Sequence, residues 1–228
     1  MIKSVKYFGI NFKYFYILHY RRSMRKENFE KQIEISESAQ IGENVKIGYN
    51  VCILGNSIIG NDVQIGSNTI IENSKIGAGV VILSSFVTNS TIGAHTSVGP
   101  FANVRDNAIV GENCRIGNFV EIKNSIIGAN TKMAHLAYIG DAEIGNNCNI
   151  SCGVIFANYN GKIKQKSYVG NNVFVGSNAN LIAPVFISDN AYIAAGSTIN
   201  KDVSAGELAI ARARQENKKN FKNPYLDK

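Results

Sequence analysis

The sequence lacks net charge over most of its length. Residues 33–204 carry ten Lys/Arg and twelve Asp/Glu, so the formal charge of +7 comes from the ends of the chain, with +6 in residues 1–32 and +3 in residues 205–228. Binding to the phosphate backbone of nucleic acid needs a basic stripe along the surface. The charge distribution therefore argues against a nucleic-acid partner.

The sequence also lacks a convincing secretory signal, because Lys13 interrupts the apolar stretch 8–20 and no small-residue cleavage site follows it. We therefore expect a protein of the reducing cytoplasm with no membrane partner. Cysteines are few, and all lie in the repetitive part of the chain: Cys52, Cys114, Cys148 and Cys152. Cys114 and Cys148 stand where Val or Thr stands elsewhere in the repeat, so we expect small core residues.

A repeat of six residues fills the rest of the sequence. An Ile or Val followed by Gly recurs at positions 41, 47, 59, 65, 76, 92, 98, 110, 116, 127, 139, 144, 169 and 175, which accounts for fourteen of the 21 glycines. An aliphatic residue every six positions, with a small residue four further on, suits a short flat strand followed by a turn. Neither a helical period nor simple alternation fits.

Three such hexads predict one triangular coil of eighteen residues, and successive coils stack at the ~4.8 Å spacing of neighbouring strands. The expected fold class is all-β, a parallel β-helix over residues 33–204 with its Ile/Val columns buried. Residues 1–32 and 205–228 are terminal extensions. Twelve residues from Ala157 to Tyr168 interrupt the period and predict one protruding loop.

In a solenoid, equivalent positions of successive coils become neighbours, so binding sites can be sought by comparing coils. On the first face, Arg105 and Lys123 fall on adjacent coils and Gly140 on the next. Two cations held ~5 Å apart repel, and an anion between them relieves the repulsion. This column predicts a phosphate site, with two solvated, salt-screened cations as the alternative.

A second column, on the third face, contains small side chains above a histidine: Asn118, His135, Cys152, Ser177 and Ala195. The rungs from His135 to Ala195 give a groove roughly 14 Å long, which suits an extended pantetheine arm. His135 could act as a general base on an amine that attacks a thioester. Tyr138 lies near the corner toward the cation column, and Glu121, one rung below Tyr138, could orient the substrate or pair with Lys123.

Four motifs are far more specific than the repeat itself: GPFANVR at 99–105, GNFVEIK at 117–123, AHLAYIGDAEIG at 134–145 and ANYN at 157–160. They closely resemble the C-terminal acetyltransferase domain of the bifunctional bacterial glucosamine-1-phosphate N-acetyltransferase and N-acetylglucosamine-1-phosphate uridyltransferase. The similarity runs from about residue 35 to 222. Families with this repeat wind left-handed, an exception to the usual crossover rule, so the resemblance implies a left-handed β-helix.

The resemblance implies transfer of acetyl from acetyl-CoA to the amine of glucosamine 1-phosphate, on the way to UDP-N-acetylglucosamine and cell-wall precursors. His135 would be the general base. The residues implied for the sugar phosphate are Arg105, Lys123, Tyr138, Asn149 and Asn158, with Glu121 in support. Those implied for acetyl-CoA are Asn158, Tyr159, Ser177, Ala195, Arg212 and Lys218, the last two across a subunit boundary of a homotrimer.

The family's N-terminal nucleotidyltransferase domain has no counterpart in the sequence, where the basic, aromatic-rich residues 1–32 stand instead. We favour a cap over the open end of the β-helix, or a misassigned start upstream of Met24, over an interfacial helix. Uridyl transfer by this chain is not expected, and a separate uridyltransferase is a candidate partner.

Two other functions stay open. One is a different sugar N- or O-acyltransferase with the same histidine and CoA groove, and the other is a non-catalytic β-helix subunit of a separate nucleotidyltransferase. A γ-class carbonic anhydrase shares the fold but needs three zinc histidines per chain, whereas the coils contain only His95 and His135. No metal site is therefore predicted.

Overall fold

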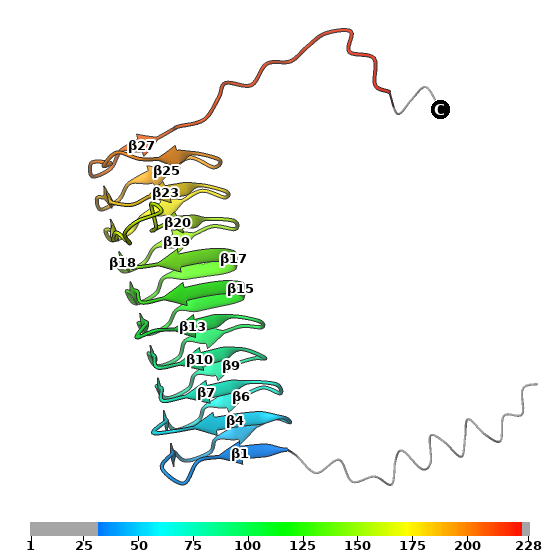
Figure 1. Ribbon diagram of the computed structural model, residues 1–228, viewed down its shortest axis with the longest axis vertical. Helices are drawn as coiled ribbons and strands as arrows, with labels where there is room; N and C mark the ends of the chain where they lie inside the picture. The colour runs from blue at the N-terminus through cyan, green and yellow to red at the C-terminus, as the bar shows by residue number, and fades with distance from the viewer. Residues whose placement is uncertain (1–31, 225–228) are drawn as a thin grey trace, which may run out of the picture. The chain divides into compact units, whose positions relative to one another are not determined.

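Strands and turns form the whole of the part of the chain that the computed structural model describes, residues 32–224, with no helix (Figure 1). Consistent with this, no helix in these residues is long and apolar enough to cross a membrane. The expectations for residues 1–31 lie outside the described residues. Every pairing between named strands is parallel, and the coils stack one on another into the predicted left-handed β-helix.

One sheet of nine strands forms the second face of the solenoid. Its strands, one to a coil, are β2 (Gln40–Ile41), β5 (Ile58–Ile59), β8 (Lys75–Ile76), β11 (Thr91–Ile92), β14 (Ile109–Val110), β16 (Ile126–Ile127), β18 (Ala142–Ile144), β21 (Ser167–Val169) and β24 (Val185–Ile187).

A sheet of eighteen strands covers the two other faces. On the first face lie β1 (Ile33–Ile35), β4 (Val51–Leu54), β7 (Ile70–Glu72), β10 (Phe86–Thr88), β13 (Asn103–Arg105), β20 (Ile155–Ala157), β23 (Asn180–Ile182) and β26 (Thr198–Ile199). On the third face lie β3 (Lys46–Ile47), β6 (Gln64–Ile65), β9 (Val81–Ile82), β12 (Ser97–Val98), β19 (Asn149–Ile150), β22 (Phe174–Val175), β25 (Tyr192–Ile193) and β27 (Leu208–Ala209). Two nine-residue strands, β15 (Arg115–Lys123) and β17 (Lys132–Gly140), run through both faces.

From the second coil on, the aliphatic residue of each hexad points into the coil and makes the core, whereas Ile41 of the first coil is 38% exposed. On the second face these residues form one vertical column, each at most 4% exposed: Ile59, Ile76, Ile92, Val110, Ile127, Ile144, Val169 and Ile187. The aliphatic side chain of each rung packs on the equivalent side chain of the rung below. The six-residue period therefore produces a continuous core.

The turns between strands use left-handed backbone conformations. Of the 22 non-glycine residues with positive φ in the described part of the chain, fourteen are asparagine, which tolerates this region better than other side chains. The amides also join neighbouring rungs, as where Asn50 donates to Asn68 at 3.2 Å and Asn172 to Asn190 at 3.1 Å. The corners are therefore held by neutral hydrogen bonds from rung to rung.

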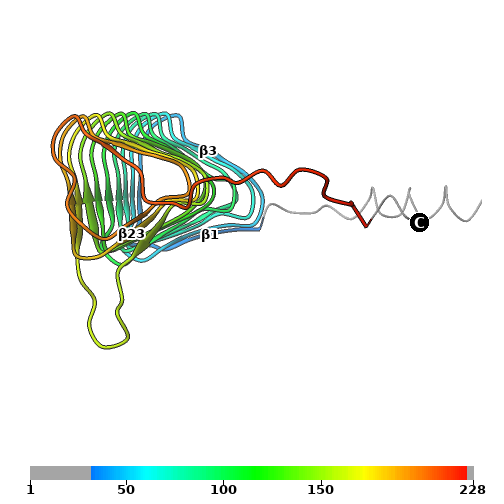
Figure 2. The same ribbon diagram turned by 90° about the horizontal axis from the view of Figure 1, so that it is seen from above.

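The predicted interruption is a protruding loop between β20 and β21, which stands out from the triangular coils when these are seen end-on (Figure 2). Tyr159 and Lys164 pair in antiparallel fashion across it, and the amide of Gln165 donates to the carbonyl of Asn158 at 2.8 Å. At the C-terminal end of the β-helix, β27 pairs with β25, so stacked strands continue beyond residue 204, where the β-helix was predicted to end.

The cysteines follow the prediction only in part. Cys114 and Cys148 are buried, and burial raises the pKa of both thiols, which makes them inert core residues. Cys52 is half-buried and Cys152 is exposed. The expectation of small core residues does not hold for Cys152, which faces outward at the corner above His135, in keeping with its place in the small-residue column.

Candidate active site

The corner between the third and first faces carries the site, because β15 and β17 pass around it without a break. Their pairing register sets Asn118 beside His135, Glu121 beside Tyr138, and Lys123 beside Gly140. Arg105 on β13 stands beside Lys123 in turn. The two columns deduced from the sequence are thus both present. Asn118 and His135 lie at the corner, and Lys123 and Gly140 lie at the first-face end of the same two strands.

His135 is exposed, and within the described part of the chain it is hydrogen-bonded through Nδ1 alone, which lies 2.7 Å from Oδ1 of Asn118. An amide oxygen accepts and does not donate, so Nδ1 is the nitrogen that carries the proton. In the neutral ring the lone pair then lies on Nε2, which faces away from the bond. This is the tautomer that a general base needs, held by a neighbour on the rung below.

The two stacked cations each have a carboxylate partner. Arg105 donates through Nε and Nη2 to Oε1 of Glu121, at 2.9 and 2.6 Å, and through Nη1 to Asp106 at 2.7 Å. These partners, the Glu121 hydrogen bond above all, raise the pKa of Arg105 further. Carboxylates therefore already lie beside both cations, and Glu121 pairs with Arg105 instead of Lys123.

Asp141 is a central residue of the site that the sequence columns missed. Its Oδ1 accepts from Asn124 Nδ2 at 2.5 Å and lies 3.8 Å from Lys123 Nζ, and its Oδ2 accepts from Asn158 Nδ2 at 2.5 Å. The side chain is only 10% exposed. A column drawn one position further along each coil, through Asn124, Asp141 and Asn158, would have found it.

Because of this network, Asp141 is charged over the whole physiological pH range. Burial alone would raise its pKa, but hydrogen bonds from Asn124 and Asn158 and the charges of Lys123 and Lys164 outweigh burial, so the pKa lies below its ordinary value. A carboxyl group with a lowered pKa stabilises the fold above its unfolded-state pKa of about 3.9, and the effect is lost as pH falls through the folded-state value.

We therefore expect Asp141→Asn to lower the free energy of unfolding by about 1 to 3 kcal/mol at pH 7, the range for hydrogen bonds to a charged group. The difference from the unsubstituted protein should begin to shrink as the pH falls below about 4, and it should vanish only below the lowered folded-state pKa, where Asp141 is protonated in both states. Urea unfolding at a series of pH values measures it. A difference that does not change with pH would contradict a charged Asp141.

The small-residue column above His135 is exposed along its length. The amide of Asn178 donates to Cys152 O at 2.9 Å, and that of Gly196 to Ser177 O at 2.8 Å, so Cys152, Ser177 and Ala195 occupy successive rungs. Arg212 donates through Nη1 to the carbonyl of Ala195 at 2.7 Å, which joins the C-terminal tail to the top of this column. Lys218 lies exposed further along the tail.

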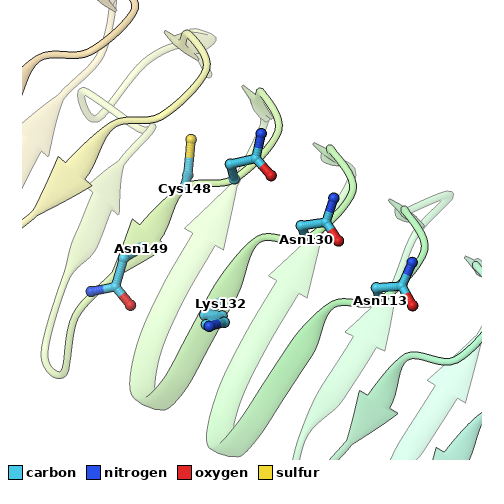
Figure 3. Close-up of a pocket in the computed structure, with 6 residues that line it drawn as sticks. Asn113, Asn130, Lys132, Cys148 and Asn149 are labelled. Carbon is cyan, nitrogen blue, oxygen red and sulfur yellow. The ribbon is translucent and has the colours of Figure 1, made fainter.

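The expected sugar contacts do not all lie together. Asn158 adjoins Asp141 at the first-face end of β17, whereas Asn149 pairs with Lys132 at the third-face start of the same strand. Figure 3 shows Lys132 and Asn149 projecting from adjacent strands, beside the corner residues Asn113 and Asn130 that line the same surface pocket. Eight residues of strand, about 26 Å along the chain and bent around a corner, separate the two ends of β17.

The remaining expected contact, Tyr159, is 59% exposed on the protruding loop. It follows Asn158, whose side chain is tied to Asp141. Asn158, Tyr138 and Lys123 are thus gathered at the first-face end of β17, while His135 lies at the corner and Ser177 and Ala195 above it.

The repeat, the stacked coils and this corner site define a hexapeptide-repeat protein. The family model described as "GMPPB C-terminal domain" matches residues 29–108 and 86–160, and that described as "Hexapeptide repeat of succinyl-transferase" matches residues 168–201. The first model covers more than half of the chain, so the chain belongs to the family of GMPPB C-terminal domains.

Curated relatives include "Bifunctional protein GlmU" of Clostridium kluyveri (strain NBRC 12016), 57% identical over 121 residues, which are 53% of this chain and 26% of that protein. The protein of the same name from Caldicellulosiruptor saccharolyticus is 60% identical over 121 residues, with coverages of 53% and 26%. These matches confirm the resemblance recognised in the sequence. The chain spans about a quarter of the length of these relatives.

Among solved structures, the UDP-N-acetylglucosamine acyltransferase from Campylobacter jejuni superposes with a TM-score of 0.51 at 23% sequence identity, covering 80% of this chain and 71% of that one. At this identity the similarity supports the fold alone.

Proposed function

We propose that this chain is an acetyl-CoA-dependent N-acetyltransferase that converts glucosamine 1-phosphate to N-acetylglucosamine 1-phosphate. The observation that carries the proposal is the hydrogen bond of His135 to Asn118, because with Nδ1 as the donor the neutral ring has its lone pair on Nε2, at the foot of an exposed groove. The 57% identity to a bifunctional protein over 121 residues supports the same chemistry. We place the reaction in the cytoplasm, in the supply of UDP-N-acetylglucosamine for the cell wall.

In the proposed reaction, the amine nitrogen of the sugar attacks the thioester carbon of acetyl-CoA. The C–N bond forms, the C–S bond breaks, and the CoA sulfur leaves. His135 Nε2 takes the proton from the attacking amine and passes it to the departing sulfur, so no covalent enzyme intermediate is needed. Asn118 stabilises the protonated ring through Nδ1 and holds its orientation.

At the phosphate end, Arg105 and Lys123 are the proposed ligands. Since Arg105 is bound to Glu121 in the structure, a phosphate has to exchange with that carboxylate or share the guanidinium with it. Glu121 lies beside Tyr138 in the strand register, so a released carboxylate can accept a hydrogen bond from the sugar there. The exchange links phosphate binding to orientation of the sugar.

At the acetyl-CoA end, the small side chains of Cys152, Ser177 and Ala195 leave room for the pantetheine arm. Arg212, already at the top of this column, and Lys218 supply cations for the CoA phosphates. Asn158 and Tyr159 at the base of the protruding loop are the proposed contacts near the acetyl group.

We propose that the working form is a homotrimer whose copies share each site. Asn149 and Asn158 lie at opposite ends of β17, which bends around the corner between them, so we assign these two sugar contacts to different copies of the chain. An apolar ridge lies along the corner beside His135, formed by Phe101, Phe119 and Leu136, which are 59%, 56% and 56% exposed. A ridge of this kind favours association with another copy.

The direct test is release of CoA thiol when the purified protein is mixed with acetyl-CoA and glucosamine 1-phosphate, with the product identified by its mass. Glucosamine without phosphate, and hexose phosphates without the amine, should give far slower release. Faster transfer to a different amino sugar would favour the alternative acyltransferase. No thiol release with any amino-sugar phosphate, and no CoA binding, would favour a non-catalytic subunit.

For the phosphate site, we expect Arg105→Ala to lower kcat/KM for glucosamine 1-phosphate by about 1.5 to 3 kcal/mol equivalent, mainly through KM, because a charge-assisted hydrogen bond to phosphate is lost. Initial rates at varied sugar-phosphate concentration measure the effect. Lys75→Ala, which removes an exposed cation from β8 on the second face, is the control and should leave KM unchanged. An unchanged KM for Arg105→Ala would contradict a phosphate contact and would make Arg105 an ordinary surface cation.

A further inference from the structure

We infer that Asp141 is a positioning residue for the acetyl transfer, which holds the Asn158 amide with its oxygen turned toward the substrate. The inference rests on the proposed function and adds a residue that neither the sequence columns nor the resemblance had assigned. It follows from the hydrogen-bond chemistry of one buried carboxylate.

The orientation of Asn158 is dictated by its partner. An ionised carboxylate only accepts hydrogen bonds, so the Asn158 atom that lies 2.5 Å from Asp141 Oδ2 has to be Nδ2. Oδ1 of Asn158 then points away from Asp141. Among the described residues it has no hydrogen-bond partner, and no fully buried side-chain polar atom there is unpaired, so Oδ1 keeps some exposed surface although Asn158 is only 8% exposed. An accepting oxygen suits the N–H of the amine or of the pantetheine arm.

Gly140 keeps the space that this arrangement needs. A Cβ at Gly140 would lie 2.5 Å from Oη of Tyr138 and 2.7 Å from Nδ2 of Asn158, both far inside normal contact distances. The phenol and the amide therefore meet over the bare backbone of Gly140. The pair Gly140 and Asp141 places both side chains, the glycine by leaving room and the aspartate by its charge.

Asp141 also secures both ends of the protruding loop. Its side chain holds Asn158, where the loop leaves β20, and its backbone carbonyl accepts from the amide of Ser167 at 3.2 Å, where the loop returns. Because Tyr159 directly follows Asn158, the hydrogen bond of Asn158 to Asp141 also fixes the backbone position of Tyr159 at the base of the loop.

A structural role alone does not require a charge here. At other corners, neutral pairs such as Asn50 with Asn68 join the rungs at 3.2 Å. Where an aspartate stands at a corner, as Asp62 does in accepting from Asn44 at 3.2 Å, the residue is exposed and its charge stays solvated. A buried carboxylate costs more desolvation than a buried amide, and it is retained only with several partners. What the charge adds at position 141 is that both neighbouring amides must turn their nitrogens inward.

The kinetic consequence separates positioning from general destabilisation. With asparagine at 141, the Asn158 amide can turn either way, so kcat should fall by about 10- to 100-fold, as for a lost hydrogen bond to a charged group. Lys123 would lose the carboxylate 3.8 Å from its Nζ, so KM for the sugar phosphate should stay unchanged or fall. A partly unfolded site would raise KM.

The experiment compares Asp141→Asn, Asn158→Ala and the double variant, in the full-length protein, by CoA-thiol release and by calorimetric binding of glucosamine 1-phosphate without acetyl-CoA. If Asp141 acts through Asn158, the double variant is no slower than Asn158→Ala alone, because coupled losses do not add. Asp62→Asn is the matched control, an aspartate at the same kind of left-handed corner that also accepts from an asparagine, and should leave the rates unchanged.

If Asp141→Asn does not fold, Gly140→Ala provides the second variant, since a Cβ there displaces Tyr138 and Asn158 while the carboxylate stays in place, and it should lower kcat. Two results would overturn the inference while leaving the proposed function standing, provided that the unsubstituted protein is active. One is an Asp141→Asn rate within about 2-fold of the unsubstituted rate, and the other is a double variant in which the two single losses multiply. Unsubstituted protein that neither transfers acetyl nor binds the sugar phosphate would overturn both.

Discussion

Replacing His135 with alanine is expected to lower kcat/KM for acetyl transfer by about 10²- to 10⁴-fold, the usual contribution of a general base. The side chain is exposed and its one hydrogen bond is to Asn118, so its removal disturbs little packing. Thiol release over a range of pH measures the loss. The thermal midpoint and the oligomeric mass should not change.

His95→Ala is the control for this experiment. His95 is also exposed and at a corner with positive φ, 57°, but it lies two coils below and away from the groove. It should keep the full rate. An intermediate variant, Asn118→Ala, frees the tautomer of His135 and should lose part of the rate. Retention of more than about a tenth of the rate by His135→Ala would assign the proton transfer to another group.

The double substitution Phe101→Asn with Phe119→Asn is expected to convert the proposed trimer to monomers and to abolish most of the proposed acetyltransferase activity. If both side chains are buried between copies, their loss weakens each interface by about 3 to 6 kcal/mol. Both residues have positive φ, 59° and 57°, in a region that bulky side chains avoid at about 1 to 2 kcal/mol per residue. Asparagine fits these corners.

The test is specific because the double substitution should weaken association between copies without lowering the stability of the single chain. The stacked rings of Phe101 and Phe119, 5.6 Å apart, contribute about 0.5 to 1.5 kcal/mol, which relief of the two strained corners offsets. The coil should therefore stay folded while its mass in sedimentation falls to that of a monomer. Phe186→Asn, at an exposed aromatic on the second face, should remain trimeric. A double variant that stays trimeric would refute the ridge as the interface.

Much of this protein could be predicted from its sequence because the repeat is simple. An Ile or Val every six positions is a local property, and stacking multiplies it into a core, so the coils, the buried columns and the protruding loop all follow from the period. The same period set the coil register, and with it the neighbours Asn118 and His135, Glu121 and Tyr138, and Arg105 and Lys123.

The period does not specify the rotamer of an outward-facing side chain, or which neighbouring side chain it contacts. Arg105 and Lys123 are neighbours as predicted, but whether they face each other or face carboxylates depends on rotamers and on residues one position away, and the structure pairs Arg105 with Glu121. Asp141 went unnoticed because its importance comes from partners seventeen residues before and after it.

The sequence by itself therefore determined the solenoid, its core and the rung on which each candidate residue stands, since all of these depend on spacing along the chain. The tertiary structure alone decided the tautomer of His135, the pairing of the cations, the orientation of Asn158 and the separation of Asn149 from the first-face site. Each of these is set by hydrogen bonds between side chains or by the bend of β17 around a corner, and those interactions exist only after the coils have stacked.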